Sequence, residues 1–528
     1  MSPTGLPSID QIGIRALLER NASQCPDGEF VAFEDGTSWT FSEALEQVFA
    51  AANVLRGLGV RQGQVVVILL GNGADFLRSW WGAAALGATT ALFNPTYHGE
   101  FLGNLLRKAE PMLLVSDSDA HTPVAASMGL PSVHPAVLRT GTADAPQLER
   151  PIEVWDAHGI LCTSGTTGGS KAVLQSYHHL HTTGSWATID AGLGPDDTLL
   201  VDLPLFHAAL NSFVVGCLAT RSRLAVRTRP QLSRYWAVAR ETGATIAVGV
   251  SAMAVYLQGQ PVAPDERDHR MRYWIGVPLP TDPIGFAQRF GISGGLLGAY
   301  GCTEVGVAVI ARPGVRYPPG SCGQARPGFE LRIVDEHDVE VPTGQAGELV
   351  IRTDLPWAIS HGYLNDAGTT AASLRNGWFH TGDALSVDED GNYYFRDRIK
   401  DVIRRRGENI SSFEIERIIA VHPAVEEAAC IAVSSDLGIE DEIKVLIVRR
   451  HGADLDYLEL VEWLAGEMPY FMVPRFFEEI EAFPKTPTGR VQKFLLRDIQ
   501  TGRCWDREPH ISVTRDGVTR RTAVSGRR

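Results

Sequence analysis

Short apolar runs alternate with segments of helical periodicity through the first 230 residues, and this alternation restricts the possible folds more than any other feature. Residues 64–70 form a β-branched run, and residues 41–58 and 75–86 on either side carry apolar side chains at helical spacing. Such runs suit parallel strands that are buried on both faces and joined by right-handed helical crossovers. Further elements are expected at 90–93, 99–109, 112–115, 199–203, 223–226 and 245–248. The sequence therefore predicts an α/β fold, with a large N-terminal domain of helices layered on a mostly parallel sheet.

The pattern changes after about residue 318. Strands at 331–334, 347–352 and 393–396 are separated by turns rich in Gly, Pro and Asp, which predicts a small antiparallel β region. A basic run at 398–406 precedes a new mixture of elements, with helices expected at 413–420 and 457–466 and strands at 427–433 and 443–449. We therefore expect residues 1–398 to form the N-terminal domain and residues 399–505 a small α+β C-terminal domain. Residues 506–528 lack an apolar period and are predicted to be a disordered tail.

Bulk composition excludes several classes of protein. The chain has 528 residues and a net charge of −14, which argues against broad binding to nucleic acid but allows a locally positive nucleotide pocket. Its longest mostly apolar stretch, residues 79–93, is shorter than the ~20 residues that a membrane-spanning helix needs. The seven cysteines are scattered without a CxxC pair, which predicts reduced thiols in a cytoplasmic protein.

A loop rich in glycine and hydroxyl side chains, Thr163-Ser-Gly-Thr-Thr-Gly-Gly-Ser-Lys171, follows the expected strand end at residues 159–162. Glycines allow backbone N–H groups to approach an anion closely, and successive N–H groups form a concave anion site. The hydroxyl groups and Lys171 add donors and a positive charge. The loop is therefore predicted to cradle phosphate, although it is not a Walker A motif. A flexible, solvated linker is the alternative.

Two further segments place aromatic and acidic side chains beside glycines. In the segment 298–304, Tyr300 offers an aromatic face for a base and Glu304 offers a carboxylate for Mg²⁺. In the segment 377–383, Asp383 follows a glycine turn and could accept both hydroxyl groups of a ribose. Taken singly, a turn with a packed tyrosine is the preferred explanation of the first segment, and an ordinary Asx-turn is the alternative for the second.

Five segments in this order resemble the adenylate-forming superfamily, which contains acyl-CoA synthetases, firefly-type luciferases and peptide-synthetase adenylation domains. They are residues 163–171, 300–304, 378–383, 398–416 and 484–496, and the resemblance covers about residues 40–497. The segment 404–416 with 420–423 is most similar to crotonobetaine/carnitine–CoA ligases. The resemblance implies that a carboxylate attacks the α-phosphate of MgATP, pyrophosphate leaves, and a thiol then displaces AMP. ATP, Mg²⁺ and CoA are the implied cofactors and co-substrates.

The resemblance also implies roles for individual residues. Tyr300 stacks on adenine opposite 276–278, Asp383 and Arg398 hold the ribose, and Thr303 touches the α-phosphate. Glu304 binds Mg²⁺, His207 lines the acid pocket, and Lys400 is the hinge about which the small domain turns between the two steps. Residues 407–413 match the loop that swings in for the second step. The complete nucleotide-binding set is Thr163, Ser164, Gly165, Thr166, Thr167, Gly168, Lys171, Gly276, Val277, Pro278, Ala299, Tyr300, Gly301, Thr303, Asp383 and Arg398.

One departure from the family pattern concerns catalysis. The C-terminal motif places a lysine directly after glycine, where it contacts the acid carboxylate and the α-phosphate, but this chain has Arg490 at that position. Arginine keeps the charge with a planar fork instead of a compact ammonium. Arg490 could still bridge carboxylate and phosphate, Lys493 could replace it, or adenylation could be slow. Arg490 is the preferred candidate.

The function predicted from these residues is acyl-CoA formation by a monomer or homodimer that acts on a small to medium acid. Three alternatives remain. Some relatives activate nitrite in order to diazotise an aryl amine. The thiol could belong to a carrier protein's phosphopantetheine instead of CoA. The third alternative, suggested by the arginine at position 490, is that the chain binds a nucleotide without catalysing a reaction.

Overall fold

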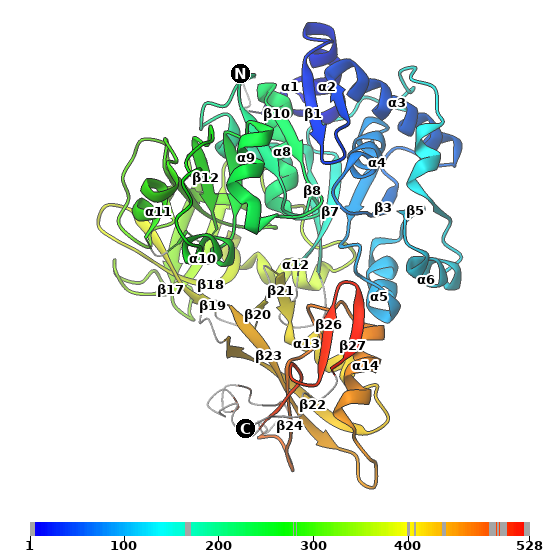
Figure 1. The fold of residues 1–528 in the computed structure, drawn as a ribbon, viewed down its shortest axis with the longest axis vertical. Coiled ribbons are helices and arrows are strands. Elements are labelled where there is room, and N and C mark those ends of the chain that lie inside the picture. Colours follow the sequence, from blue (N-terminus) through cyan, green and yellow to red (C-terminus); the bar gives the residue numbers. More distant parts are fainter. Residues whose placement is uncertain are drawn as a thin grey trace.

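The structure is a computed structural model that describes residues 6–163, 171–277, 279–280, 282–398, 402–405, 408–435, 440–484, 491, 493, 496 and 504–521 (Figure 1). A six-stranded sheet in the order β6-β5-β3-β4-β7-β8 lies near the N-terminus, and its neighbouring strands are parallel except for β7 and β8. Its strands are β3 (Val65–Leu69), β4 (Thr89–Leu92), β5 (Leu113–Ser116), β6 (Ser132–Val133), β7 (Ala157–Thr163) and β8 (Lys171–Ser176).

A second, thirteen-stranded sheet has the order β16-β17-β18-β19-β15-β14-β13-β12-β11-β9-β10-β1-β2. Its parallel strands are β1 (Glu29–Phe33), β9 (Thr198–Val201), β10 (Arg223–Val226), β11 (Ile246–Gly249), β12 (Tyr273–Gly276) and β13 (Leu296–Cys302), with β2 (Ser38–Thr40) antiparallel at one edge. The predicted antiparallel region continues this sheet from β13 as β14 (Gly306–Ile310), β15 (Gly323–Ala325), β16 (Phe329–Val334), β17 (Gly347–Thr353), β18 (Phe379–Val387) and β19 (Asn392–Arg398).

Alternate residues of the central strands explain the layering. In β3, Val66 and Ile68 enter one apolar cluster while Val67 and Leu69 enter another. In β9, Val201 shares the first cluster while Leu200 faces a third. Successive side chains of a strand point to opposite faces, so the parallel parts of both sheets are buried on both faces and the first cluster fills the space between them.

Helices cover these faces. The helices of the large domain are α1 (Ile9–Ile12), α2 (Ile14–Gln24), α3 (Phe41–Gly57), α4 (Ala74–Ala85), α5 (Gly99–Ala109), α6 (Thr122–Ser127), α7 (Tyr177–Thr188), α8 (Ala208–Thr220), α9 (Tyr235–Thr242), α10 (Ser251–Gly259), α11 (Pro283–Phe290) and α12 (Ala367–Ser373), with short 3₁₀ turns η1 (Asp119–His121), η2 (Pro135–Arg139), η3 (Leu232–Arg234) and η4 (Arg375–Gly377). The predicted α/β class is confirmed, but the parallel strands are divided between two sheets instead of one.

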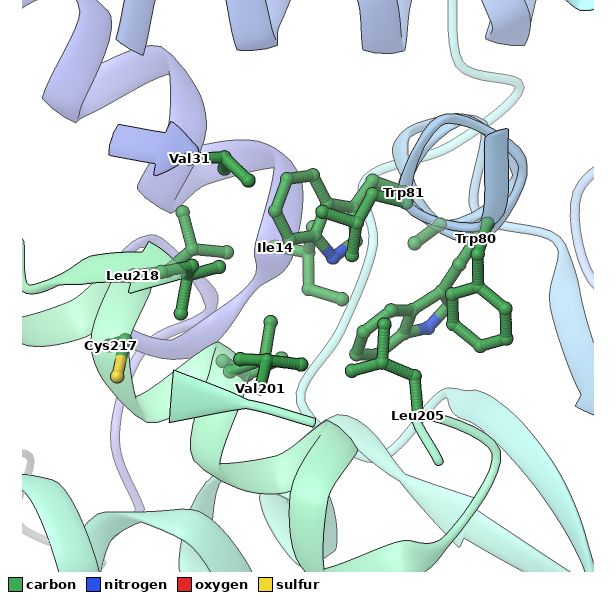
Figure 2. Close-up of a cluster of buried hydrophobic side chains, with 14 of the residues drawn as sticks. Ile14, Val31, Trp80, Trp81, Val201, Leu205, Cys217 and Leu218 are labelled. Carbon is green, nitrogen blue, oxygen red and sulfur yellow. The ribbon is translucent and has the colours of Figure 1, made fainter. Parts of the chain in front are cut away.

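The uncharged stretch at 79–93 forms part of the core. Trp80 and Trp81 on α4 are fully buried, and Figure 2 shows them among side chains of α2, β1, β9 and α8. The Trp81 ring stacks on Phe30 with a centroid distance of 5.7 Å. Among the residues that the structure describes, no helix combines the length and the apolar composition needed to cross a membrane.

The small C-terminal domain lies below the large one in Figure 1. It contains β20 (Val402–Arg405), β21 (Glu408–Ser411), α13 (Ser412–Ile419), β22 (Val425–Ser434), β23 (Asp441–Arg449), α14 (Tyr457–Glu467), β24 (Phe476–Glu479) and β25 (Trp505–Asp506). One apolar cluster joins the domains, because Phe101 and Leu105 of α5 share it with Leu464 and Met468. The His98 ring also hydrogen-bonds the Ala465 carbonyl at 3.1 Å.

The prediction of disorder from residue 506 is wrong up to residue 521. Strands β26 (Ile511–Thr514) and β27 (Gly517–Arg520) form a hairpin, in which Ile511 and Val513 are buried in the cluster that joins the domains. Arg520 pairs with Glu462 of α14 at 2.6 and 2.8 Å. Two alternating apolar residues are too short a period to identify from sequence, and burial against distant elements stabilises them. Residues 522–528 lie outside the described part of the chain.

Candidate active site

A cavity of about 770 Å³ lies where both sheets of the large domain meet the small domain. Parallel strands of both sheets point their carboxyl ends at it: Thr163 ends β7, Leu203 follows β9, Val250 follows β11, Val277 follows β12 and Thr303 follows β13. Ligands of open α/β sheets bind outside the carboxyl ends of strands, so the location agrees with a nucleotide site. Its volume is typical of small-molecule sites.

One end of the cavity contains both flanks of the predicted phosphate cradle. Thr163 lies opposite Lys171 in the antiparallel β7–β8 pair, and both line the cavity. Ser164, Gly165, Thr166, Thr167 and Gly168 lie outside the described residues. The Lys171 ammonium lies 4.6 Å from the centre of the Tyr363 ring, in cation–π geometry. The two flanks therefore bring a cation and a hydroxyl group to the same end of the cavity.

Glu304 lies at the same end and is held by contacts from distant parts of the chain. Its Oε1 accepts hydrogen bonds from the Tyr363 hydroxyl at 2.8 Å and from the Thr163 hydroxyl at 3.5 Å. Its backbone carbonyl accepts from Ser360 N–H at 2.7 Å, and the Thr303 carbonyl accepts from the Gln175 amide at 3.0 Å. The carboxylate is thus fixed in position beside Thr163 and Lys171.

Asp383 lies in a second polar region of the cavity, on β18. It is 8% exposed, and its Oδ2 accepts a hydrogen bond from the Tyr300 hydroxyl at 2.8 Å. The preceding Gly382, at φ +71°, donates its N–H to Glu348 Oε1 at 2.9 Å. The β18–β19 register places Asp383 opposite Arg398, and the role of both residues in holding the ribose stays a prediction.

Tyr300 is held differently from the arrangement expected for adenine stacking. Its ring is 6% exposed, lies parallel to Phe395 at 6.3 Å, and is not one of the described residues that line the cavity. Burial, and then the nearby Asp383 carboxylate, raise the pKa of Tyr300 well above its usual value. In this arrangement Tyr300 therefore positions Asp383, and its stacking on adenine remains a prediction.

The two glycines around the β13–β14 turn satisfy a packing requirement. A Cβ on Gly301 would come within 2.2 Å of the Gly306 carbonyl oxygen, and a Cβ on Gly306, at φ +68°, would come within 2.4 Å of the Thr183 hydroxyl. The close approach at Gly301 is therefore an approach of backbone to backbone. Ala299, Gly301 and Thr303 all line the cavity.

His207 lies at the N-terminus of α8 and lines the cavity, while its place in an acid pocket stays a prediction. Its Nε2 is 3.2 Å from Oε1 of Glu408 on β21. Burial alone would lower the pKa of His207, but the charge of Glu408 and the hydrogen bond to it outweigh burial and raise the pKa above its usual value. This pair joins the large domain to the small domain inside the cavity.

Other residues of the small domain also reach the cavity. Arg404 of β20 donates to the Val277 carbonyl at 3.3 Å, and Ile410 of β21 is a lining residue. Gly276, unlike Val277, is absent from the described lining, and Pro278 lies outside the described residues. The strand pair β20–β21 therefore closes one side of the cavity.

Among the remaining predicted residues, Lys493 is the one that the structure describes, and it is not brought to the cavity. Lys493 pairs with Glu416 at 2.6 Å and donates to the Ser412 hydroxyl at 2.7 Å, within the small domain. It is not among the described residues that line the cavity. Arg490 and Lys400 lie outside the described residues, and the position of the Arg398 side chain is not described. The cation that acts on the acid is therefore not identified by this arrangement.

Sequence reasoning missed several residues of the site. Tyr363 and Glu348 line the cavity and fix Glu304 and the Gly382 turn. Trp186 of α7 and Phe213 of α8 line its apolar part, with ring centroids 5.8 Å apart. No sequence motif marks these residues as part of a site. A tyrosine before a turn, or an aromatic residue in an apolar helix, usually belongs to a core. Only their long-range contacts identify them.

The cysteines agree with the prediction of unpaired thiols. All seven are free, and Cys162 and Cys302 line the cavity. Burial raises the pKa of both thiols, which keeps them protonated. A protonated thiol is a poor nucleophile, so neither cysteine is assigned a catalytic role.

The chain belongs to the family of AMP-binding enzymes. The family model described as "AMP-binding enzyme" matches residues 18–364, and the model of the AMP-binding enzyme C-terminal domain matches residues 414–490. The predicted membership of the adenylate-forming superfamily, and the prediction of an enzyme, are confirmed.

Individual relatives agree. The chain is 29% identical over 490 residues to a crotonobetaine/carnitine–CoA ligase of Salmonella paratyphi A, covering 87% of this chain and 93% of that protein. The fold is similar to o-succinylbenzoate CoA synthetase from Bacillus subtilis bound with a product analogue, with TM-score 0.82, 22% identity and coverage of 92% and 98% of the two chains. ATP-bound MatB from Rhodopseudomonas palustris is similar with TM-score 0.67, 24% identity and coverage of 92% and 98%.

Proposed function

We propose that this chain is an ATP-dependent acid–thiol ligase, which joins a carboxylic acid to AMP and then transfers the acyl group to CoA. The observation that carries the proposal is the convergence of Thr163, Glu304 and Asp383, from three separate predicted motifs, on one cavity. Relatives named as CoA ligases over most of the chain support the same reaction class.

The two steps are balanced displacements. In the first, a carboxylate oxygen attacks the α-phosphorus of ATP, the bond to the β-phosphate oxygen breaks, and pyrophosphate leaves with the electron pair. In the second, the thiol sulfur attacks the acyl carbon, the bond to the phosphate oxygen of AMP breaks, and AMP leaves while the thiol proton is released. Positioning and neutralisation of charge are the main contributions an enzyme makes to such transfers.

The polar end of the cavity fits a triphosphate. Lys171 supplies positive charge and Thr163 a hydroxyl group for the distal phosphates, and Thr303 lies next to Glu304 for the α-phosphate. Asp383, held by Tyr300 and by the Gly382 turn, would accept hydrogen bonds from the ribose. These contacts come from the large domain, so nucleotide binding depends mainly on that domain.

Glu304 fits a magnesium ion that arrives with the nucleotide. Mg²⁺ is usually bound through one or two carboxylates together with substrate phosphates, and Glu304 is a fixed carboxylate beside the proposed phosphate site. When bound, the ion would neutralise charge on the phosphates. Tyr363 would keep the carboxylate of Glu304 oriented toward that position.

The residues that the small domain places in the cavity favour the thioester-forming step for this orientation of the two domains. Glu408 and Ile410 lie in the segment that resembles the family's second-step loop, and both line the cavity. The His207–Glu408 pair would hold that loop in place while the thiol enters. Arg490 remains the proposed cation for the first step, which requires the other orientation of the small domain.

The test is pyrophosphate release from ATP over a panel of carboxylic acids, with and without CoA and with nitrite as a separate arm. The expected result is pyrophosphate with at least one carboxylic acid, and acyl-CoA with AMP when CoA is added. Release with nitrite alone would overturn the proposal in favour of diazotisation. Binding of ATP without pyrophosphate from any acid would overturn it in favour of a non-catalytic nucleotide-binding protein.

A further inference from the structure

The turn that carries Asp383 is a bulge in the antiparallel strand pair β17–β18. The register shifts between Glu348 and Val350 of β17, so the single residue between them lies opposite the three residues 381–383 of β18. A bulge of this kind interrupts the ladder of backbone hydrogen bonds, because the partner strand has too few carbonyl groups opposite it. The N–H groups of the bulge therefore need acceptors that side chains supply.

Glu348 supplies one of these acceptors from the neighbouring strand. Its Oε1 accepts the Gly382 N–H at 2.9 Å, and Gly382 has a left-handed φ of +71°. Its Oε2 lies 3.0 Å from His380 Nδ1, which fixes the orientation of the carboxylate. Within the bulge, the Thr381 hydroxyl accepts the Asp383 N–H at 3.1 Å. Side chains therefore hold the last two backbone N–H groups of the turn.

The carboxylate of Glu348 lies at the edge of the cavity and is held by fixed partners. Its side chain is 18% exposed and lines the cavity. The buried His380 ring lies between Glu348 and Arg375, whose Nη2 is 3.1 Å from His380 Nδ1. Arg375 is anchored in turn by Asp338 at 2.6 and 2.8 Å. An apolar group in place of the carboxylate would deprive the Gly382 N–H of a charged acceptor, which forms a stronger hydrogen bond than a neutral one.

We propose that Glu348 is a positioning residue of the ribose site, which holds the Gly382 turn in the conformation that lets Asp383 accept both ribose hydroxyl groups. The inference rests on the proposed function and adds to its nucleotide site a residue that acts through the turn. The Tyr300 hydroxyl holds the Asp383 carboxylate at 2.8 Å, whereas Glu348 holds the backbone that carries it. Loss of the Glu348 carboxylate should therefore weaken the contacts to the ribose hydroxyl groups and spare the contacts to the phosphates.

The experiment compares ATP with 2′,3′-dideoxy-ATP, which lacks the two hydroxyl groups that Asp383 is proposed to bind. With the full-length enzyme and the most active acid of the panel, kcat/KM for pyrophosphate release with the two nucleotides gives a ribose ratio. The ratio is measured for Glu348→Ala, which removes both carboxylate oxygens, and for Glu348→Gln, which keeps an oxygen acceptor for the Gly382 N–H. Glu330→Ala is the matched control, because Glu330 lies on β16 of the same sheet and pairs with Arg352 at the surface.

Glu348→Ala is expected to lower the ribose ratio about 5- to 30-fold, whereas Glu348→Gln and Glu330→Ala should change it by less than about 3-fold. Activity of Glu348→Ala with the dideoxy nucleotide should persist, which shows that the variant is folded. An unchanged ratio in Glu348→Ala, or an equal loss with both nucleotides, would overturn the inference while leaving the ligase reaction intact. Absence of pyrophosphate release by the unsubstituted enzyme with ATP and every acid would overturn the proposed function itself.

Discussion

Replacement of Asp383 by alanine tests the assignment of the ribose site most directly. The carboxylate is 8% exposed, and the Tyr300 hydroxyl donates to its Oδ2 at 2.8 Å. The substitution therefore removes two things together, the proposed acceptor for the ribose hydroxyl groups and the partner of a buried tyrosine. An informative experiment has to separate these losses.

The expected magnitude follows from the hydrogen bonds involved. A hydrogen bond to a charged group contributes about 1.5–3 kcal/mol, and the ribose would donate two of them to a carboxylate that is shielded from water. Allowing for water that enters the truncated site, we expect Asp383→Ala to weaken ATP binding by about 3 kcal/mol. That is about 100-fold in Kd.

Calorimetric titration of ATP into the full-length protein measures this change, and Tyr300→Phe is the control. Tyr300→Phe removes the hydroxyl group but keeps the ring and the carboxylate, so its Kd should change by less than about 10-fold. The assignment of Asp383 to the ribose is refuted if Asp383→Ala leaves Kd within about 3-fold. It is also refuted if Tyr300→Phe reproduces the whole loss, because the carboxylate would then matter only through the tyrosine.

Three further predictions concern other parts of the site and the tail. Lys171→Ala should slow pyrophosphate release only moderately, about 10-fold, because Lys171 serves the distal phosphates; an unchanged rate would remove Lys171 from the site. Glu408→Gln should slow acyl-CoA formation about 5- to 30-fold in single-turnover assays while leaving acyl-AMP formation intact. Because Glu408 raises the pKa of His207, the ion pair is complete below that raised pKa and weakens as pH rises through it, so the effect of Glu408→Gln should shrink at high pH. Removal of residues 508–528 should lower the unfolding free energy by up to about 3–6 kcal/mol through the loss of buried Ile511 and Val513, whereas Arg520→Ala should change the melting temperature little.

Elements with strong local patterns could be predicted from the sequence almost to the residue. The helix expected at 99–109 is α5 (Gly99–Ala109), and the strand expected at 223–226 is β10 (Arg223–Val226). In both segments the apolar period and the flanking breakers agree, so tertiary contacts do not have to override local preference. The partition of the strands into two sheets could not be predicted, because β3 and β9 have equally apolar sequences and only pairing distinguishes them.

Residues of the candidate site likewise differ in whether a local sequence motif marks them. Thr163, Glu304 and Asp383 could be identified because each lies in a compact motif of glycines and polar residues. Tyr363, which binds Glu304 from 59 residues away, has no such motif around it. Trp186 is even less visible, since an indole in an apolar helix is normally part of a core and only its position in the lining of the cavity distinguishes it.

The two steps of the proposed reaction depend on different domains, because the residues assigned to each step lie in different parts of the chain. The groups assigned to the nucleotide, Lys171, Glu304 and Asp383, belong to the large domain and are held by contacts within it. The small domain contributes Glu408, whose contact with His207 crosses between the domains, while Lys493 is paired with Glu416 inside the small domain. Reorientation of the small domain would therefore break the His207–Glu408 contact, whereas the Tyr363–Glu304 and Tyr300–Asp383 hydrogen bonds lie within the large domain. It follows that variants of Glu304 and Asp383 should impair both steps, whereas variants of Glu408 should impair only thioester formation.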